Sequence, residues 1–439
     1  MTPATATIEA PSSAAAAAPP VPRTLADTGL AIDHIEQLIL KTLYTGELTG
    51  TAIAEAMRLP YSLIEPLIER ARAERMLEVR GATGTGSAGY RYVLTDLGRD
   101  RTREYLNVNG YIGPAPVPLA QYYATMMRLQ AARGFVERDR LRNAFGHLVI
   151  SDSLLEQLGP AVNANKAIFL YGPPGNGKSV VADGMGKAMG GDMYVPHAID
   201  VEGSVITMFD PIAHEPLETE DGIFNLIADA RDRRWVRIRR PVVVVGGELT
   251  LSMLDLTFNH TSKFYEAPLQ LKANGGVLLV DDFGRQRMRP EDLLNRWIVP
   301  LESRIDFLTL HTGKKFQVPF DVLVSFATNL DPAKLADEAF LRRIPYKIPI
   351  HDPTADQFAR IWELNCRRHK LPFDPDTLVY LYHHHYEPIK RPLRACQPRD
   401  LIEQVVALCR YRGIEPVLTP ENLDAACAAY FIDDPVAAA

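Results

Sequence analysis

The chain has 439 residues, of which 46% are hydrophobic and 23% charged, and its formal net charge is −6. This length exceeds what a single hydrophobic core supports and predicts two or three domains. The mildly negative charge excludes a general attraction to nucleic acid or to an anionic membrane, so either kind of binding would need a local patch. No stretch approaches the about 18 consecutive apolar residues of a membrane helix, and we therefore expect no membrane partner.

Residues 1–27 are predicted to form a disordered leader. The first 22 residues are rich in Ala, Pro, Ser and Thr, and they lack the basic segment and the apolar core of a signal peptide. A segment of this composition has too little apolar surface to fold by itself.

Residues 28–108 carry the pattern of a winged helix, which is an α+β fold. Apolar residues at helical spacing predict a first helix, a short second helix over residues 51–57, and a third helix that opens with Ser62 and Glu65 as a capping box. Two short strands then flank a glycine-rich loop, residues 81–89, and a closing helix follows. The loop is the predicted wing.

The winged-helix prediction leaves the partner of this domain open. The candidate recognition helix, residues 61–77, contains three glutamates and three arginines, so its charges cancel. Helices that read DNA usually carry net positive charge. Arginines around the wing keep DNA open as a partner, although it is not favoured, and docking of a protein is at least as well supported.

Three further segments follow in the chain. Residues 109–150 are predicted to be a linker and a helix, because Asn, Gly and Pro are frequent over residues 109–118 and apolar residues at helical spacing come next. Residues 151–350 alternate short apolar runs with helical segments, which predicts an α/β domain built on a parallel sheet. Residues 351–439 are dominated by helical signals and predict a small helical domain.

The strongest motif is an apolar strand, Ala167–Tyr171, that runs directly into a glycine-rich loop and then into a helical segment. Backbone N–H groups of such a loop and the N-terminus of the following helix together bind phosphates, as in a Walker A motif. Lys178 is expected to reach the β- and γ-phosphates of ATP, and the Ser179 hydroxyl to ligate Mg²⁺. The predicted nucleotide-binding residues are Gly172, Pro173, Pro174, Gly175, Asn176, Gly177, Lys178 and Ser179.

A second motif has the form of a Walker B strand, because the apolar run Val277–Val280 ends in two carboxylates. Asp281 is expected to hold Mg²⁺ through its water shell, and Asp282 to polarise the attacking water. The structural alternative for Asp282 is a solvated helix cap. Aspartate is one methylene shorter than glutamate, so we expect slow chemistry if Asp282 is the base.

From these motifs the chain resembles the AAA+ family of P-loop ATPases over roughly residues 150–430. The strand ending in Ser325-Phe326-Ala327-Thr328-Asn329 is similar to the sensor 1 strand, and the resemblance implies that Asn329 orients the attacking water. Residues 339–344 are similar to the arginine-finger segment, which implies that Arg343, or its neighbour Arg342, faces the γ-phosphate of an adjacent subunit. Many AAA+ proteins have glutamate at the position of Asp282.

Two further AAA+ motifs extend the resemblance. Gln397-Pro398-Arg399-Asp400-Leu401 resembles sensor 2, which implies that Arg399 is the contact of a helical lid to the phosphates. Leu158-Gly159-Pro160-Ala161 matches the stretch that contacts adenine, which implies a nucleotide contact at Gly159. All of these motifs occur in the order expected for the family.

The segment before the Walker B strand departs from the simplest AAA+ pattern. Residues 237–251 predict a hairpin that turns at Gly246-Gly247. An insertion there is similar to helix-2-insert members, which include magnesium-chelatase-like and enhancer-binding-activator ATPases. The Gly-Ala-Phe-Thr-Gly-Ala loop of the activators is absent from the sequence, so their polymerase contact is not expected here.

Three clusters have simpler readings. Residues 231–240 hold six arginines and one aspartate, which favours a solvated edge strand over a nucleic-acid surface. Consecutive residues on a helix point in different directions, so His383-His384-His385 predicts a polar surface rather than a metal site. The cysteines lack the spacing of a zinc site or a disulfide framework and predict reduced, buried thiols in a cytoplasmic protein. They are Cys366, Cys396, Cys409 and Cys427.

The sequence therefore predicts a AAA+ ATPase that couples binding and hydrolysis of ATP, with Mg²⁺, to remodelling of a protein partner. The winged helix would be its adaptor, and the arginine-finger resemblance implies a homo-oligomer, either a ring or an ATP-dependent assembly. An ATP-switched DNA-binding regulator is the alternative. A nucleotide-binding scaffold with little turnover is a third reading, because of Asp282.

Overall fold

The computed structural model describes residues 18–84, 86–217, 231–335 and 338–432. The chain divides into two compact units. Unit 1 contains Met1–Phe135, Met189–Leu278 and Gln286–Leu323, and unit 2 contains Val136–Ala188, Leu279–Arg285 and Val324–Ala439. The chain passes between the units several times, so these units differ from the sequential domains that the sequence predicts.

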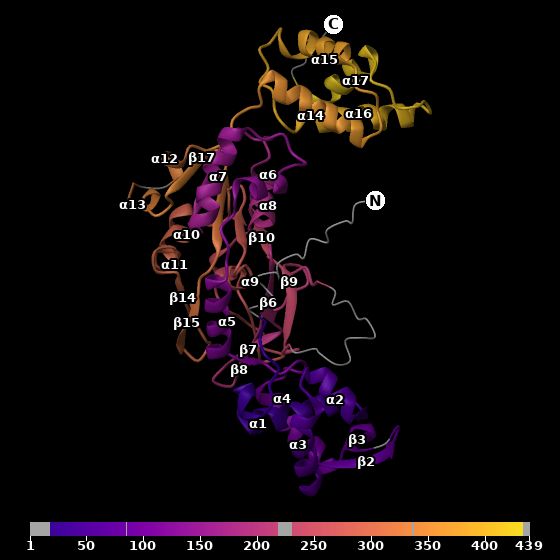
Figure 1. The fold of residues 1–439 in the computed structure, drawn as a ribbon, viewed down its shortest axis with the longest axis vertical. Coiled ribbons are helices and arrows are strands. Elements are labelled where there is room, and N and C mark those ends of the chain that lie inside the picture. The colour runs from indigo at the N-terminus through magenta and orange to yellow at the C-terminus, as the bar shows by residue number, and fades with distance from the viewer. Residues whose placement is uncertain (1–17, 85, 218–230, 336–337, 433–439) are drawn as a thin grey trace, which may run out of the picture. The chain divides into compact units, whose positions relative to one another are not determined.

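The N-terminal part of unit 1 has the helices and strands expected for residues 28–108 (Figure 1). They are α1 (Ile32–Leu43), β1 (Leu48–Thr49), α2 (Gly50–Met57), α3 (Tyr61–Ala73), β2 (Leu77–Ala82), β3 (Tyr90–Leu94) and α4 (Asp96–Val108). The strands form an antiparallel sheet in the order β1-β3-β2. Thr49 and Thr95 cap α2 and α4 with their hydroxyl groups.

The predicted capping box of α3 is wrong. The helix begins at Tyr61 after Pro60, so Ser62 lies inside it, and no side chain caps its first turn. Glu65 instead accepts a hydrogen bond from Ser87 in the loop between β2 and β3. The pattern of a capping box gives no information about a competing partner from a distant loop.

The remaining elements of unit 1 surround a second sheet with the strand order β11-β12-β8-β7-β4. Its strands are β4 (Val117–Pro118), β7 (Ala198–Val201), β8 (Ser204–Thr207), β11 (Thr257–Phe258) and β12 (Tyr265–Glu266). The other elements are α5 (Leu119–Ala131), β6 (Asp192–Pro196), β9 (Trp235–Arg239), η5 (Leu251–Leu254), α9 (Leu269–Lys272), α10 (Pro290–Arg296), α11 (Ile298–Ser303), β14 (Ile305–Thr309) and β15 (Lys315–Pro319). β6 pairs with β9 and β14 with β15, both antiparallel.

Residues 109–118 are not a free linker. Tyr111 and Val117 are buried, and β4 pairs in parallel with β7. The hydrophobic core around α1, α2 and α3 also includes Ala198 of β7 and Val205 of β8. The N-terminal helices therefore share one core with β7 and β8, which lie well over a hundred residues further along the chain.

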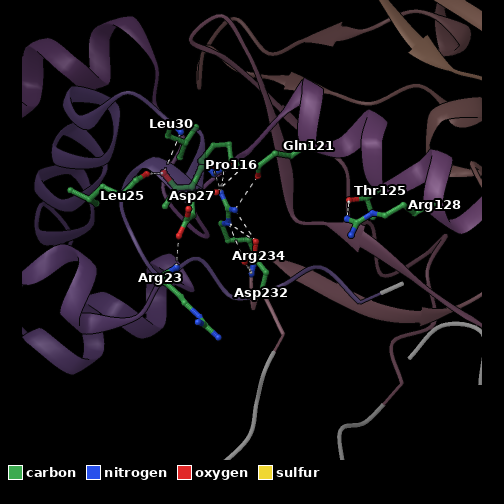
Figure 2. Close-up of polar contacts among 11 residues, drawn as sticks. Arg23, Leu25, Asp27, Leu30, Pro116, Gln121, Thr125, Arg128, Asp232 and Arg234 are labelled. Carbon is green, nitrogen blue, oxygen red and sulfur yellow. Dashed lines mark hydrogen bonds and ion pairs between the residues drawn. The ribbon is translucent and has the colours of Figure 1, made fainter. Parts of the chain in front are cut away.

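A buried ion pair fixes the start of the described chain in unit 1. The side chains of Arg234 and Asp232 are 1% and 3% exposed, and Nη2 of Arg234 donates to Asp232 Oδ2 at 2.8 Å. The same guanidinium donates to the Thr28 carbonyl at 2.9 Å and to Gln121 Oε1 at 3.2 Å, as Figure 2 shows for Gln121. The Asp232 N–H donates to the Pro19 carbonyl at 2.9 Å.

These contacts correct two predictions. Residues 18–27 of the predicted leader are held against unit 1, whereas residues 1–17 lie outside the described residues. Residues 231–240 are not simply a solvated edge, because Arg234 is buried with a full set of partners and Arg240 donates to the carbonyl of Gly275 at 2.6 Å. Charge composition does not report which arginine points inward.

The central sheet has five strands in the order β10-β13-β16-β5-β17. They are β5 (Ile168–Tyr171), β10 (Val242–Val245), β13 (Val277–Val280), β16 (Leu323–Thr328) and β17 (Tyr346–Pro349). β5 pairs in parallel with β16 on one side and with β17 on the other, with Leu170 opposite Ala327 and Ile348. The predicted hairpin at Gly246-Gly247 is wrong, because β10 is the edge strand of this sheet and β9 pairs with β6.

The other elements of unit 2 are helical. They are α6 (Arg138–Ala144), α7 (Asp152–Ala164), α8 (Lys178–Met189), α12 (Pro332–Leu335), α13 (Glu338–Leu341), α14 (Ala355–Arg368), α15 (Pro375–Leu381), η6 (Tyr382–Tyr386), α16 (Gln397–Tyr411) and α17 (Pro420–Tyr430). The helices from α14 onward pack around their own apolar core, which confirms the predicted C-terminal helical region (Figure 1). In the described part of the chain, no helix has both the length and the apolar character needed to cross a membrane.

The histidine triplet is only partly a polar surface. His383 and His384 are exposed, but His385 is fully buried, and its Nε2 lies 2.8 Å from Asp424 Oδ1. Among the described residues, no cluster of His, Cys, Asp and Glu has the makeup of a metal site. Three of the four free cysteines are buried as predicted, and Cys396 is half-buried.

Candidate nucleotide-binding site

The glycine-rich loop joins β5 to α8 and requires its glycines. Gly172 has φ 143°, and a Cβ placed there would lie 2.2 Å from the Ile350 carbonyl oxygen. Gly175 has φ 81°, and a Cβ there would lie 2.6 Å from Cys396 Sγ. Since α8 begins at Lys178, the N–H groups of its first turn face the loop, where they can bind an anion.

Lys178 is buried beneath this loop. Its Nζ donates to the carbonyls of Gly172 at 3.0 Å and Pro173 at 2.9 Å, and to Asn329 Oδ1 at 2.6 Å. Burial lowers the pKa of Lys178, while the nearby charges of Asp281 and Asp282 oppose that shift. The ammonium group thus lies between the loop and the end of β16.

Ser179 and Asp281 meet at the end of β13. Ser179 Oγ donates to Asp281 Oδ2 at 2.5 Å, and the Asp282 N–H donates to Asp281 Oδ1 at 2.9 Å. A hydroxyl and a carboxylate are hard oxygen donors, and Mg²⁺ is usually held by one or two carboxylates together with phosphates and water. The donor set therefore fits Mg²⁺.

Asp282 has different surroundings from Asp281. It is exposed, it adopts φ 48°, and its Oδ1 accepts a hydrogen bond from Asn329 Nδ2 at 3.3 Å. The next helix, α10, begins only at Pro290, so Asp282 does not cap a helix. Its carboxylate is free to face solvent beside Lys178, Ser179 and Asn329.

The loop before α16 also reaches the glycine-rich loop, a contact that the sequence does not reveal. The N–H of Cys396 donates to the Gly175 carbonyl at 2.9 Å, and the N–H of Ala395 donates to Asn176 Oδ1 at 3.1 Å. Asn176 Nδ2 donates in turn to Asp352 Oδ1 at 2.7 Å. The position of Asp352 shortly after the end of β17 at Pro349 is a signal that could have identified it.

Arg399, the residue that the sensor 2 resemblance implies, pairs with its neighbour Asp400. Its Nε and Nη2 both donate to Oδ1 of the adjacent Asp400, at 2.9 and 2.7 Å, and half of its side chain is exposed. Arg394, in the loop before α16, pairs with Asp352, which accepts a hydrogen bond from Asn176 of the glycine-rich loop. The role of Arg399 as a phosphate contact stays a prediction.

Gly159, the predicted adenine contact, lies within α7, where a Cβ would face Leu141 at 3.6 Å, and its role stays a prediction. A cavity of about 290 Å³ lies beside Asn176 and Val181, next to the preceding turn of α7. Its lining includes Ile150, Leu154, Gln157, Ile350, Gln357 and Ile361.

Arg342 and Arg343 follow α13 and precede β17. Arg342 is exposed and Arg343 is half-buried, and the Arg343 N–H donates to the Phe340 carbonyl at 2.8 Å. Which of the two faces a neighbouring subunit stays a prediction.

In unit 2, the glycine-rich loop, the two carboxylates and Asn329 follow β5, β13 and β16, and these strands are neighbours in the central sheet in the order β13-β16-β5. The helical region from α14 onward completes the arrangement that the sequence predicts. The central sheet and the C-terminal helices confirm the predicted α/β fold class. The resemblance to helix-2-insert members stays a prediction.

Comparisons with known proteins give only distant matches. One family profile, a domain of unknown function (DUF8689), matches residues 354–429, within the helical lid. No curated protein matches the chain.

Solved structures with a similar fold include NtrX from Brucella abortus, at 15% identity and a TM-score of 0.42, over 72% of this chain and 63% of that one. RuvB, the Holliday junction branch migration motor of Thermotoga maritima, has 13% identity and a TM-score of 0.38, over 65% of this chain and 71% of that one. The complex of the magnesium chelatase subunits BchI and BchD contains a chain with 14% identity and a TM-score of 0.32, over 64% of this chain and 90% of that one. The match to NtrX spans less than two thirds of that protein. Similarity at this level adds no argument about activity or partners.

Proposed function

We propose that this chain binds ATP with Mg²⁺ and hydrolyses it. The observation that carries the proposal is the meeting of distant segments at the glycine-rich loop, where Ser179 Oγ donates to Asp281 at 2.5 Å and Lys178 Nζ donates to Asn329 at 2.6 Å. A phosphate-binding lysine, oxygen donors for a metal and polar groups for a water molecule are the parts that phosphoryl transfer to water requires.

The residues divide this task according to their surroundings. Lys178 and the loop N–H groups would bind the phosphates, and Ser179 and Asp281 would hold Mg²⁺, which supplies charge neutralisation on the β- and γ-phosphates. Asp282 would orient the attacking water and accept its proton at a carboxylate oxygen. The Asn329 amide, which donates to Asp282 at 3.3 Å, would keep that carboxylate in place.

Substitutions at two residues test this assignment. Lys178→Ala should abolish ATP binding, measured by calorimetry. Asp282→Asn should retain ATP binding and lower the rate of phosphate release by about a hundredfold or more, because the carboxylate is used mainly at the chemical step. Full hydrolysis by both variants would refute the proposal, and a wild-type protein that binds ATP without turnover would support the scaffold reading.

We further propose that hydrolysis in a homo-oligomer of this chain remodels a protein partner, with the N-terminal winged helix as adaptor. The pairing of the arginines around the candidate recognition helix supports a protein partner over DNA. Arg72 lies 2.6 Å from Glu69 and Arg91 lies 3.1 Å from Glu47, and Arg70 pairs with Glu36. Paired guanidinium groups leave little net positive charge for a phosphate backbone. The absence of disulfides among the four cysteines fits the cytoplasmic location that we propose.

A further inference from the structure

The loop Arg394-Ala395-Cys396 forms a bridge between the lid and the glycine-rich loop. Two backbone N–H groups of this bridge, those of Ala395 and Cys396, donate to Asn176 and Gly175. The Arg394 N–H donates to Gln397 Oε1 at 2.8 Å, and this oxygen also accepts from the Tyr386 hydroxyl at 3.0 Å. Hydrogen bonds therefore hold this bridge both to Gln397 of α16 and to the glycine-rich loop.

The Arg394 side chain is held beside the phosphate-binding loop by a carboxylate. Its Nη1 pairs with Asp352 Oδ1, the same oxygen that accepts Asn176 Nδ2 at 2.7 Å. Asn176 belongs to the loop itself, so one carboxylate oxygen connects the guanidinium group to the site where phosphates would bind. The charge of Arg394 also acts on Lys178, whose pKa is lowered first by burial and further by this arginine. Two cations thus lie within electrostatic range of each other at one site, an arrangement that a polyanion would stabilise.

Arg399 has its donors engaged within the lid. Nε and Nη2 bind Asp400 Oδ1, and the other oxygen of Asp400 accepts from the Tyr430 hydroxyl at 2.9 Å. This network orders the start of α16 and directs the Arg399 guanidinium to its own neighbour.

We propose that Arg394, rather than Arg399, is the lid residue that binds the phosphates of the nucleotide, and that Asp352 holds its guanidinium beside the glycine-rich loop until then. This inference rests on the proposed function. A phosphate oxygen accepts a hydrogen bond from an arginine side chain as a carboxylate oxygen does, so bound ATP can replace Asp352 as the partner of Arg394. Asp352 would keep its hydrogen bond from Asn176. The exchange would couple nucleotide binding to the lid, because Arg394 belongs to the lid and Asp352 follows β17 of the sheet.

Matched substitutions in the full chain test the assignment. Arg394→Gln and Arg399→Gln remove the same charge from two lid arginines that are five positions apart. We expect Arg394→Gln to weaken binding of ATP with Mg²⁺ about tenfold, the loss typical of one charge-assisted interaction. We expect Arg399→Gln to bind ATP within about twofold of the wild-type protein, since its contacts lie within the lid.

Adenosine, which has no phosphates, separates phosphate binding from a general disturbance of the site. Competition of adenosine with a fluorescent ATP analogue should give the same affinity for Arg394→Gln and for the wild-type protein. An equal loss for adenosine and ATP, unchanged ATP binding in Arg394→Gln, or a tenfold loss in Arg399→Gln would each overturn the inference. Wild-type protein and Lys178→Ala are measured in the same series, because failure of wild-type binding, or binding that does not need Lys178, would contradict the proposed function itself.

Discussion

Neighbouring residues of the same type take different roles at this site because their surroundings differ. Asp281 accepts from Ser179 Oγ and from the N–H of Asp282, whereas Asp282 is exposed and bonded to the Asn329 amide. The first carboxylate is thereby placed beside Ser179, the proposed Mg²⁺ ligand, and the second is exposed beside Asn329, as the proposed role in orienting water requires. The same contrast separates Arg394, which pairs across to Asp352, from Arg399, which pairs with its own neighbour.

At the residue scale, Arg343 is expected to complete the site of an adjacent subunit. Arg343→Ala should bind ATP normally and hydrolyse it roughly a thousandfold more slowly, because such an arginine neutralises charge that develops in the transition state. Mixing this variant with Lys178→Ala should restore part of the turnover, since a mixed interface can combine an intact loop with an intact arginine. Normal hydrolysis by Arg343→Ala, or a specific activity that does not change on dilution to monomer, would show that one chain contains the whole site.

Also at this scale, the buried pair of Arg234 and Asp232 predicts a large effect on stability. Arg234→Met leaves the Asp232 carboxylate buried without its cation and should destabilise unit 1 by about 3–5 kcal/mol, measured by denaturant unfolding. Arg239→Met, five positions further along, is the control, because the Arg239 side chain is 65% exposed and its ion-pair partner among the described residues is the exposed Glu215. It should cost less than about 1 kcal/mol. A similar decrease in the free energy of unfolding for both variants would show that burial of Arg234 does not increase its contribution to stability.

At the scale of elements, α3 and the β2–β3 hairpin present arginines that are largely paired with glutamates. The charges that a DNA-binding helix would offer to phosphates are thus engaged within the protein. The arrangement of helices and strands alone therefore does not indicate DNA binding, because DNA affinity at physiological salt depends on net positive charge more than on helix geometry.

We therefore expect the full chain to bind random duplex DNA weakly. Its dissociation constant should lie in the range of nonspecific complexes, from about 1 μM to about 0.1 mM, or above it. Fluorescence anisotropy at two salt concentrations measures both affinity and its salt dependence. Tight binding that falls steeply as salt increases would favour the ATP-switched DNA regulator over the protein-remodelling ATPase.

At the scale of the whole molecule, unit 1 joins the N-terminal helices to residues 189–278 through a common core. Ala198 and Val205 pack in the same cluster as Ile35, Ile53 and Ile64. The N-terminal helices are therefore part of a larger folded body, and they cannot be separated from residues 189–278 without exposing apolar surface to water.

Removal of residues 1–110 should consequently damage the rest of unit 1. Loss of the helices that cover Ala198 and Val205 should lower the melting temperature and promote aggregation, because the exposed surface loses its burial energy. Differential scanning calorimetry and light scattering measure these two effects. A truncated chain that melts like the wild-type protein and stays monodisperse would show that the N-terminal domain is independent, as a separate 28–108 domain requires.

The sequence alone located the glycine-rich loop, the two carboxylates that follow Val277–Val280, Asn329 and the helical character of the C-terminal region. These features can be predicted because each is local: a glycine-rich loop between a strand and a helix, or an acid after an apolar run, is defined by residues that are adjacent in the chain. The strands β5, β13 and β16 formed where the apolar runs predict them.

Only the tertiary structure decided which residues from distant segments meet. Four features depend on partners that lie tens to hundreds of residues away. They are the pairing of Arg394 with Asp352, the cavity beside Val181, the burial of Arg234 and the position of β10 at the sheet edge. Local propensity says nothing about such partners, because a guanidinium group is stable either in water or against a buried carboxylate, and the surrounding packing selects between the two.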